Sequence, residues 1–496
     1  MLPPGFLDAA RALVRADTVS ANGTRAAVDA LAPLYEAAGL ALRRQVVREG
    51  PVEHVNALAG PGGTGTDAKG PSRMHVPGGL LLVTHLDTVP SGPREAWTKT
   101  GSDPWALTEE DGILFGLGCA DVKLDALCKI EAARRLRETR LRRPFWLLGT
   151  FGEEVGLRGA RHFAGSDLFA EIGPRQVLCG EPSKLELISA HKGYVVVRCT
   201  LVDARARLVS TAGPGIEELT FAGKAAHSST PHLGVNAIRR AIAWARASGS
   251  PVIAARGGSS ANVVPARCHL EVPAPRENGE PRPDGSRFLP SGPSRPNLWR
   301  ALATAGALED LWLSVLGEAE PRADARFDPA GAVGGLNVIE SEDESETPAQ
   351  AIHARVSLRA TLDGRLLPEH DPDALIGRFE ERAHAWVREL GQGELTLTVE
   401  AMRNARGMSL PQDAALLRGA GKALQAVGLD PSPRAKPTST EAGVFARKGC
   451  EAAVFGPGVS TGNAHTPNER IEIAQLEKAI EAYQRIVLEL CGTAGL

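Results

Sequence analysis

Two ionisable residues stand at the end of an apolar stretch near position 85. The residues Gly79 to Thr84 read GLLLVT, and His85-Leu86-Asp87 follows directly. An apolar run bounded by glycine on one side and Pro90 on the other is typical of a buried strand in a parallel sheet. A metal ligand followed by a carboxylate that orients its ring is one chemical reason for such a pair. An ordinary structural hydrogen bond explains the pair equally well when it is considered alone.

Four further segments carry ionisable residues where predicted strands end or helices begin. In open α/β sheets, sites collect at the carboxyl ends of the strands. Nitrogen and oxygen ligands without thiolate suit Zn²⁺, with Co²⁺ or Mn²⁺ as possibilities, and five ligands can hold two metals if one carboxylate bridges them. The segments are Ala120-Asp121-Val122-Lys123, Gly152-Glu153-Glu154, Gly180-Glu181-Pro182 and Ala464-His465-Thr466-Pro467.

The adjacent pair Glu153 and Glu154 allows a division of labour. Neighbouring side chains project differently, so one can bind a metal while the other faces bound water and moves a proton. A solvated helix start is the plainer interpretation of a Glu-Glu pair, but the apolar stretch just before it argues against that.

Strand and helix patterns alternate in the first part of the chain, which predicts an α/β domain with a parallel sheet. Helical periodicity covers residues 6–38 and 120–137, and strands are expected at 56–59, 80–83, 144–150 and 176–179.

The pattern changes after Lys192, where strands and helices predict a small α+β unit inserted into the first domain. The expected domains are 1–192, 193–400 and 401–496, the last completing the first. Residues 273–349 are rich in Pro and Gly and end in an acidic run, so we interpret them as an extra insertion with one helix at 301–317. In the inserted unit, strands are expected at 194–202, 354–362 and 394–400, and helices at 234–247 and 372–390.

Composition limits the kinds of protein this chain can be. Its 496 residues favour two domains, and 43% hydrophobic with 23% charged residues is ordinary for a globular protein. A net charge of -3 without a long basic stripe argues against nucleic-acid binding. Since no apolar run approaches the ~18 residues of a membrane span, we expect no membrane association. Seven scattered cysteines without CxxC spacing fit reduced thiols in the cytoplasm.

Five motifs, in order, resemble the aminoacylase, acetylornithine deacetylase and succinyl-diaminopimelate desuccinylase family of co-catalytic zinc hydrolases. The resemblance implies a zinc-exopeptidase-like catalytic domain with a mainly parallel sheet, and an inserted ferredoxin-like α+β domain that serves as lid and dimerisation domain. The motifs are Thr84-His85-Leu86-Asp87-Thr88-Val89-Pro90, the stretch from Gly116 to Lys123, Glu153-Glu154 with Gly156, Gly180-Glu181-Pro182, and the stretch from Gly456 to Glu469.

The resemblance also implies roles for residues of the first domain. Asp121 would bridge two zinc ions, with His85 and Glu181 completing one site and Glu154 and His465 the other. Asp87 would hold the His85 ring through its second nitrogen, and Glu153 would be the general base. Gly458 of the last motif would contact substrate.

In the inserted domain, His227 resembles the histidine that reaches the partner subunit's site and stabilises the oxyanion. Arg365 resembles the arginine that grips a substrate carboxylate. Asn262 and Asn337 compete for one substrate-binding role, and Asn262 is preferred.

The chain departs from the family pattern at three places. Thr84 stands where Gly is usual, Leu124-Asp125 replaces Gly-Gly, and the 273–349 segment separates Asn262 from Arg365.

The function that these features imply is a dinuclear zinc amidohydrolase, forming a homodimer through the lid domain and acting on an N-acyl amino acid or short peptide. Several details resemble acetylornithine deacetylase most, among them Gly116-Leu117-Gly118 and Thr440-Glu441-Ala442. A dipeptidase or carboxypeptidase and a succinyl-diaminopimelate desuccinylase are the alternatives. A non-catalytic binding relative is disfavoured, because every proposed ligand and the general base are present.

Overall fold

The chain folds into two compact units. The computed structural model describes residues 1–61, 78–209, 215–274, 287–289, 295–342, 353–391 and 394–493. The first unit comprises Met1–His191 and Met408–Leu496, and the second comprises Lys192–Gly407. The boundary expected between residues 400 and 401 falls inside strand β19 (Leu395–Ala405), which pairs with the second unit's sheet.

A mixed sheet forms the centre of the first unit. Four neighbouring strands, in the order β6-β3-β7-β22, run parallel, whereas β1, β2, β8 and β20 extend the sheet with antiparallel pairs. The expected α/β class is confirmed, although the sheet is mixed: its four middle strands are parallel, and β21 also pairs with β8 in parallel. The strands of this sheet are β1 (Leu40–Glu49), β2 (Val52–Pro61), β3 (Leu80–His85), β6 (Phe145–Thr150), β7 (Gln176–Cys179), β8 (Ile188–His191), β20 (Met408–Ser409), β21 (Arg434–Lys436) and β22 (Glu451–Val454).

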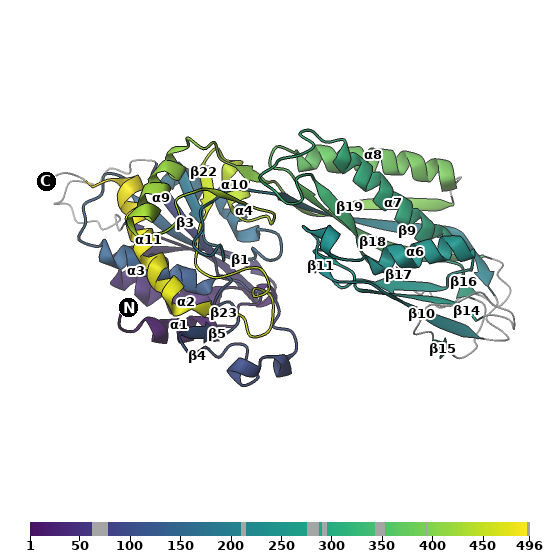
Figure 1. The fold of residues 1–496 in the computed structure, drawn as a ribbon, viewed down its shortest axis with the longest axis horizontal. Coiled ribbons are helices and arrows are strands. Elements are labelled where there is room, and N and C mark those ends of the chain that lie inside the picture. Colours follow the sequence, from purple (N-terminus) through teal and green to yellow (C-terminus); the bar gives the residue numbers. More distant parts are fainter. Residues whose placement is uncertain are drawn as a thin grey trace. The chain divides into compact units, whose positions relative to one another are not determined.

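Helices cover both faces of this sheet (Figure 1). Leu80 and Leu82 of β3 belong to one core with α1, α2, α3, α9 and α11, whereas Leu81 and Val83 belong to another core with α4 and α10. This alternation explains why the first four residues of β3, Leu80 to Val83, are all apolar, because a strand buried on both faces has no solvent side. The helices are α1 (Phe6–Arg15), α2 (Arg25–Ala37), α3 (Lys123–Arg135), α4 (Arg158–Ala164), α5 (Asp167–Ile172), α9 (Ala415–Ala426), α10 (Ala442–Ala446) and α11 (Ile473–Cys491).

A small antiparallel sheet completes the first unit and includes the strand that follows the last motif. Its order is β23-β5-β4, and Ile471 of β23 is paired with Leu114 of β5. The three strands are β4 (Thr108–Glu110), β5 (Ile113–Phe115) and β23 (Arg470–Glu472).

The described residues of the second unit form a large antiparallel sheet with three helices on it, and a separate two-stranded sheet. The helix α7 contacts both α6 and α8, so the three lie side by side on one face. The elements are α6 (Ala237–Ser248), α7 (Trp299–Gly317), α8 (Pro372–Gly391), β9 (Gly193–Val209), β10 (Ile216–Ala222), β11 (Ala226–His227), β12 (Ala254–Gly257), β13 (Val263–Val264), β14 (Arg267–Pro273), β15 (Arg287–Leu289), β16 (Arg295–Pro296), β17 (Val333–Glu342), β18 (His353–Leu366) and β19.

The segment 273–349, expected to be an extra insertion within the 193–400 domain, supplies core elements of the second unit. Its predicted helix is α7, and Trp312 of that helix is completely buried. Its strand β17 lies inside the sheet, between β12 and β18. The acidic run is described only as far as Glu342, at the end of β17. The Pro- and Gly-rich composition concealed that this segment belongs to the core of the second unit, because its apolar residues are buried by partners distant in the chain.

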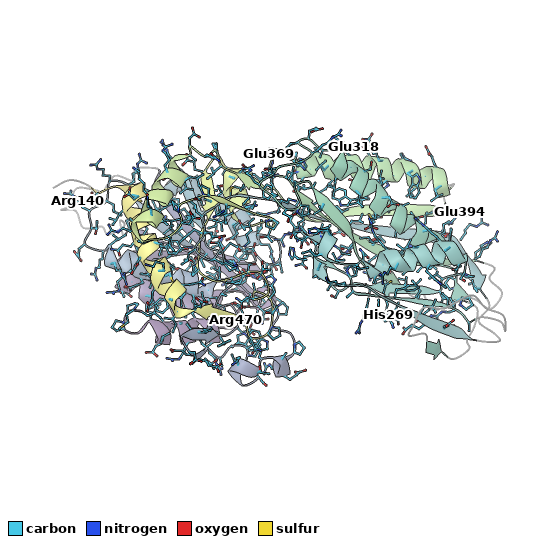
Figure 2. The ribbon with its side chains drawn as sticks, viewed as in Figure 1. Arg140, His269, Glu318, Glu369, Glu394 and Arg470 are labelled. Atoms are coloured by element: carbon cyan, nitrogen blue, oxygen red, sulfur yellow. The ribbon has the colours of Figure 1, made fainter. Side chains whose placement is uncertain are left out.

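Charged side chains cover the outside of each unit, as Arg140 in the first and Glu318 in the second show (Figure 2). None of the helices among the described residues combines the length and apolar character needed to cross a bilayer. All seven cysteines are free and buried.

Candidate metal centre

The parallel strands bring the predicted ligands to one edge of the first unit's sheet. His85 is the last residue of β3 and is paired with Thr150, the last residue of β6. Glu153 and Glu154 follow β6, and Glu181 follows the neighbouring strand β7. The carboxyl ends of these parallel strands therefore lie at the same edge of the sheet, as expected for an α/β domain.

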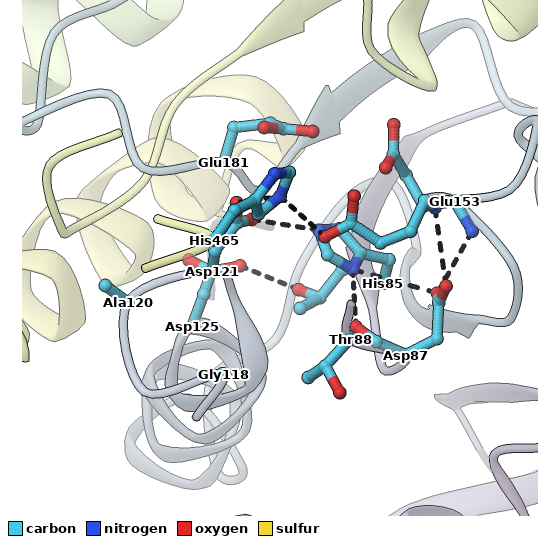
Figure 3. A network of polar contacts seen from close by, with 12 residues as sticks. His85, Asp87, Thr88, Gly118, Ala120, Asp121, Asp125, Glu153, Glu181 and His465 are labelled. Atoms are coloured by element: carbon cyan, nitrogen blue, oxygen red, sulfur yellow. Dashed lines mark hydrogen bonds and ion pairs between the residues drawn. The ribbon is translucent and has the colours of Figure 1, made fainter. Parts of the chain in front are cut away.

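Asp121 lies between two imidazole rings and turns one carboxylate oxygen toward each. Its Oδ1 is 3.2 Å from His85 Nε2, and its Oδ2 is 3.4 Å from His465 Nε2 (Figure 3). The second ring also contacts Glu154, with 2.9 Å between His465 Nε2 and Glu154 Oε1. This arrangement joins residues that are more than three hundred positions apart in sequence.

Hydrogen bonds and opposite charges hold this cluster together. Burial alone would raise the pKa of Asp121, but hydrogen bonds from both rings hold it well below its ordinary value. Burial lowers the pKa of His465, yet its bonds to Asp121 and Glu154 outweigh burial and raise the pKa to about 11. The same balance raises the pKa of His85 well above 6.5. The carboxylates around both rings therefore favour the protonated form of each imidazole.

The backbone of Asp87, rather than its side chain, orients the ring of His85. His85 Nδ1 lies 3.0 Å from the Asp87 carbonyl oxygen, whereas the Asp87 carboxylate is 3.8 Å from the same nitrogen. A carbonyl only accepts, so Nδ1 carries a proton and Nε2 is the nitrogen that faces Asp121. This differs from the expected role of the Asp87 carboxylate, because the side chain turns toward other donors.

The Asp87 carboxylate instead fixes the loop that carries the two glutamates. Its Oδ1 accepts from the backbone N–H of Glu153 at 3.0 Å, and its Oδ2 accepts from that of Glu154 at 3.3 Å (Figure 3). The Ser20 hydroxyl donates to Oδ2 at 2.6 Å. Asp87 thus holds the predicted base and a predicted ligand through their main chain. No local signal identified Ser20, because it lies 67 residues before Asp87.

Glu469 holds the loop that carries Asp121. Its Oε1 accepts from the N–H groups of Ala120 and Asp121 at 2.8 and 2.9 Å, and its Oε2 accepts from Gly118 at 3.0 Å. Burial and the charge of Asp121 raise the pKa of Glu469 to about 7, although the three N–H groups oppose this. The last motif contained this residue, but its position four residues after His465 gave no indication of its partners.

The loop after β22 carries His465 in an uncommon backbone conformation. His465 and Asn468 both have φ near 62°, in the left-handed region that non-glycine residues rarely adopt. Two hydrogen bonds from Asn463 Nδ2, to Val459 O and Arg470 O, brace this loop. Gly458 has φ 92°, and a Cβ there would lie 3.0 Å from the Ala120 carbonyl oxygen. Its N–H donates to Gln475, which is a structural use of a residue expected to bind substrate.

The side chain of Glu181 forms a long ion pair with Lys436. Its Oε2 lies 3.5 Å from Lys436 Nζ. Burial raises the pKa of Glu181 and Lys436 lowers it, while the charges of Asp121 and Glu154 raise it further. A further buried carboxyl, Glu441, accepts from Thr150 at 3.0 Å. Burial raises its pKa to about 7 despite the charge of His85.

The remaining predicted residues belong to the second unit. His227 ends β11 and is exposed, and its Nδ1 accepts from the Ser229 N–H at 3.2 Å. The neutral ring therefore carries its proton on Nε2 and can donate from there. Arg365 is buried, lies over the Tyr194 ring with its Cζ 3.5 Å from the centroid, and donates to Ser228.

The two asparagines differ in how far their side chains are engaged. Asn337 is buried, and its Nδ2 donates to Ala261 O at 2.7 Å and to Asp363 at 2.9 Å. Asn262 is half-buried, and its Oδ1 accepts from the Ser260 hydroxyl. The side chain of Asn337 is therefore committed to the fold, which favours Asn262 for contact with a ligand.

The donor set fits a borderline cation such as zinc. His85, Asp121 and Glu154 each offer one ligand atom, and these atoms all lie within 4.8 Å of one another. Two ligands of a tetrahedral zinc, each at about 2.0–2.1 Å, are separated by about 3.3 Å. The contacts of Asp121 with His85 and His465, at 3.2 and 3.4 Å, have that spacing.

Comparison with known proteins identifies the family. The model of peptidase family M20/M25/M40 matches residues 81–489, most of the chain. The chain belongs to this family. The match begins within β3 and ends within α11, so it includes all five predicted metal ligands. The expected resemblance to aminoacylases and acetylornithine deacetylases is thereby confirmed.

Curated relatives of this M20/M25/M40 chain match over part of their length. It is 39% identical over 162 residues to an acetylornithine deacetylase of Photorhabdus laumondii subsp. laumondii, covering 33% of this chain and 35% of the relative. It is 33% identical over 244 residues to the acetylornithine deacetylase of Klebsiella pneumoniae, covering 48% and 53%. The chain thus spans about half or less of the length of these relatives.

Solved structures share the fold over the whole chain. The aminoacylhistidine dipeptidase of Vibrio alginolyticus has a TM-score of 0.63 at 15% identity, covering 99% of this chain and 98% of that one. A metallo-carboxypeptidase of the M20 family from Sulfolobus solfataricus has a TM-score of 0.57 at 17% identity, covering 99% of each. These matches establish an M20-type fold.

Proposed function

We propose that this chain is a dinuclear zinc amidohydrolase that cleaves the amide of an N-acyl amino acid, in the manner of an acetylornithine deacetylase. The observation that carries the proposal is the position of Asp121, with one oxygen toward His85 and the other toward His465. A carboxylate so placed can bridge two cations. The matches to curated acetylornithine deacetylases support this substrate class.

Zinc would supply a Lewis acid for the amide carbonyl and lower the pKa of a bound water. His85 and Glu181 would hold one ion, Glu154 and His465 the other, and Asp121 both. Cobalt or manganese would suit the same oxygen and nitrogen donors.

Glu153 would be the general base that transfers the proton. Its backbone is fixed by Asp87, and its carboxyl is buried beside the ligand Glu154. It would take a proton from the attacking water and return it to the leaving amine. The chain therefore provides separate carboxylates for metal binding and proton transfer.

The family resemblance assigns further roles to residues of the second unit, with His227 acting at the partner subunit's site. His227, with its proton on Nε2, has the donor that an oxyanion needs. Arg365 would bind the substrate carboxylate, with Asn262 as a further contact, and Gly458 of the first unit would also contact substrate. We expect a homodimer through the second unit and a cytoplasmic enzyme, for which the free, buried thiols are suited.

A dipeptidase or carboxypeptidase is the second candidate, and the whole-chain fold matches to such enzymes favour it. Succinyl-diaminopimelate desuccinylase remains a third member of the same class. Initial rates of zinc-loaded protein on N-acetylornithine, N-succinyl-diaminopimelate and a dipeptide panel distinguish the three. We expect N-acetylornithine to be hydrolysed fastest. If the protein hydrolyses none of these amides, the proposed amidohydrolase function is wrong.

The role of Glu153 is tested by Glu153→Ala. We expect the variant to bind zinc as the wild type does and to lose hydrolysis by about 10²–10⁴-fold, the usual contribution of a general base. The exposed Glu186→Ala in the same unit is the matched control and should leave both quantities unchanged. Turnover by Glu153→Ala at the wild-type rate would exclude the assigned role.

A further inference from the structure

A completely buried ion pair lies behind the metal centre. Asp125 and Lys129 stand one turn apart on α3, with side chains 0% and 2% exposed, and Lys129 Nζ is 2.5 Å from Asp125 Oδ2. Removing two charges from water is costly unless further hydrogen bonds compensate. An ion pair in this position therefore requires a reason beyond helix stability.

The network around this pair is complete. The Lys129 ammonium has three hydrogens, and its three acceptors are Asp125 Oδ2, Thr84 Oγ1 at 2.7 Å and Val83 O at 2.6 Å. The Thr84 hydroxyl in turn donates to Asp125 Oδ2 at 2.7 Å. Asp125 Oδ1 accepts from the Tyr483 hydroxyl of α11.

The Tyr483 hydroxyl links the pair to another strand end. It lies 2.8 Å from the carbonyl oxygen of Phe455, directly after β22. Burial and the charge of Asp125 raise the pKa of Tyr483 well above 10, which keeps it a donor. Two family departures noted separately in the sequence, Thr84 and Asp125, are thus hydrogen-bonded partners.

Three of the chain segments that meet the pair also carry a predicted ligand. Thr84 precedes His85, and Asp125 follows Asp121 by four residues. Gly180, which precedes Glu181, packs so closely that a Cβ there would lie 2.0 Å from Asp125 Oδ2 and 2.6 Å from Lys129 Nζ. One buried carboxylate therefore sets the backbone positions from which three ligands project.

We propose that Asp125 and Lys129 form a positioning pair that sets the spacing of His85, Asp121 and Glu181, so that zinc affinity depends on the pair. This inference rests on the proposed metal centre. Neither side chain is itself a ligand, because both are sealed within the core by Thr84, Tyr483 and Gly180. Partners that orient metal ligands commonly change metal affinity by about 10–100-fold when replaced.

The test removes both charges together, because a single replacement would leave the other charge buried and unpaired. Asp125→Asn/Lys129→Met keeps the volume of both side chains. The measurements are the zinc dissociation constant, by competition with a fluorescent chelator, and the visible absorption spectrum of the cobalt-loaded protein. We expect affinity to fall by about 10-fold or more and the cobalt bands to shift, with a melting temperature of the metal-free protein close to that of the wild type.

A second variant pair keeps the test valid if the double variant does not fold. Thr84→Val removes the hydroxyl that links Asp125 and Lys129 while retaining the shape, and Thr84→Ser retains the hydroxyl. We expect Thr84→Val to weaken zinc binding and Thr84→Ser to restore it. Glu131→Gln on the same helix, where Glu131 pairs with Arg134, is the control and should bind zinc normally.

The outcomes separate this inference from the proposed function. If His85→Ala loses zinc while the double variant and Thr84→Val bind it with wild-type affinity, the positioning role is wrong and the metal centre stands. A lower melting temperature with unchanged affinity would likewise show a purely structural pair. If the wild type binds no zinc, or His85→Ala binds it unchanged, the metal centre itself is refuted and the inference falls with it.

Discussion

Replacing Asp87 by asparagine tests whether this carboxylate acts on the glutamate loop or on the His85 ring. The side chain is completely buried and accepts from Ser20, from Glu153 N and from Glu154 N. Asparagine has the same shape but only one acceptor oxygen, and its NH₂ group only donates. The backbone carbonyl that holds His85 is unchanged by the substitution.

The structure sets the size of the effect. The better orientation keeps the oxygen 3.0 Å from Glu153 N and turns NH₂ toward Ser20, whose hydroxyl can rotate to accept. The N–H of Glu154 then faces another donor. Losing one hydrogen bond to a charged acceptor costs about 1.5–3 kcal/mol, so we expect the free energy of unfolding to fall by about 2–3 kcal/mol. That corresponds to a melting temperature lower by about 4–12 °C.

Urea unfolding followed by tryptophan fluorescence measures the stability, and ¹⁵N spectra of labelled histidine report the proton on His85 Nδ1. Asp17→Asn is the matched control, since Asp17 is exposed and also accepts from a backbone N–H. We expect His85 to keep its Nδ1 proton in the variant. An unchanged free energy of unfolding, within about 0.5 kcal/mol, together with an altered His85 signal would refute the reasoning.

Three further predictions concern protons and loop anchoring. With a pKa of about 11, His465 is protonated at pH 7 in the metal-free protein, so the stability from its contacts is complete below pH 6.5 and is lost as pH rises toward 11. Zinc binding should therefore release at least one proton per chain. Calorimetry in buffers of different ionisation enthalpy measures this release, and a binding heat that does not depend on the buffer would contradict it. Glu469→Gln places an NH₂ group against the backbone N–H donors of the Asp121 loop and should weaken zinc binding by about 10-fold or more. An unchanged zinc dissociation constant would show that the position of Asp121 does not depend on Glu469. Burial raises the pKa of Asp363 to about 7 despite the charge of Arg365, so the stability that this carboxyl contributes is present below pH 3.8 and is lost as pH rises toward 7. Urea unfolding of Asp363→Asn should not show this decline. If the free energies of unfolding of the wild type and the variant depend on pH in the same way, the prediction is wrong.

Much of the centre was predictable because its ligands are encoded locally. His85, Glu154 and Glu181 each follow an apolar strand, and strands of one parallel sheet end at the same edge. The sequence therefore indicated which side chains meet. It could not indicate which atoms meet, and so it assigned the His85 ring to the Asp87 carboxylate when the carbonyl holds it.

Amino-acid sequence by itself determined the family, the α/β class and the set of candidate ligands, because apolar periodicity and short motifs depend on neighbouring residues. Only the tertiary structure decided the supports of those ligands: Ser20 on Asp87, Glu469 on the Asp121 loop, and the buried pair behind β3. The tertiary structure also decided that β17 and α7 belong to the core of the second unit, because their apolar residues are buried by strands and helices distant in the chain. The physical reason is that a buried polar group needs a hydrogen-bond partner, and in the folded chain this partner can come from any part of the sequence.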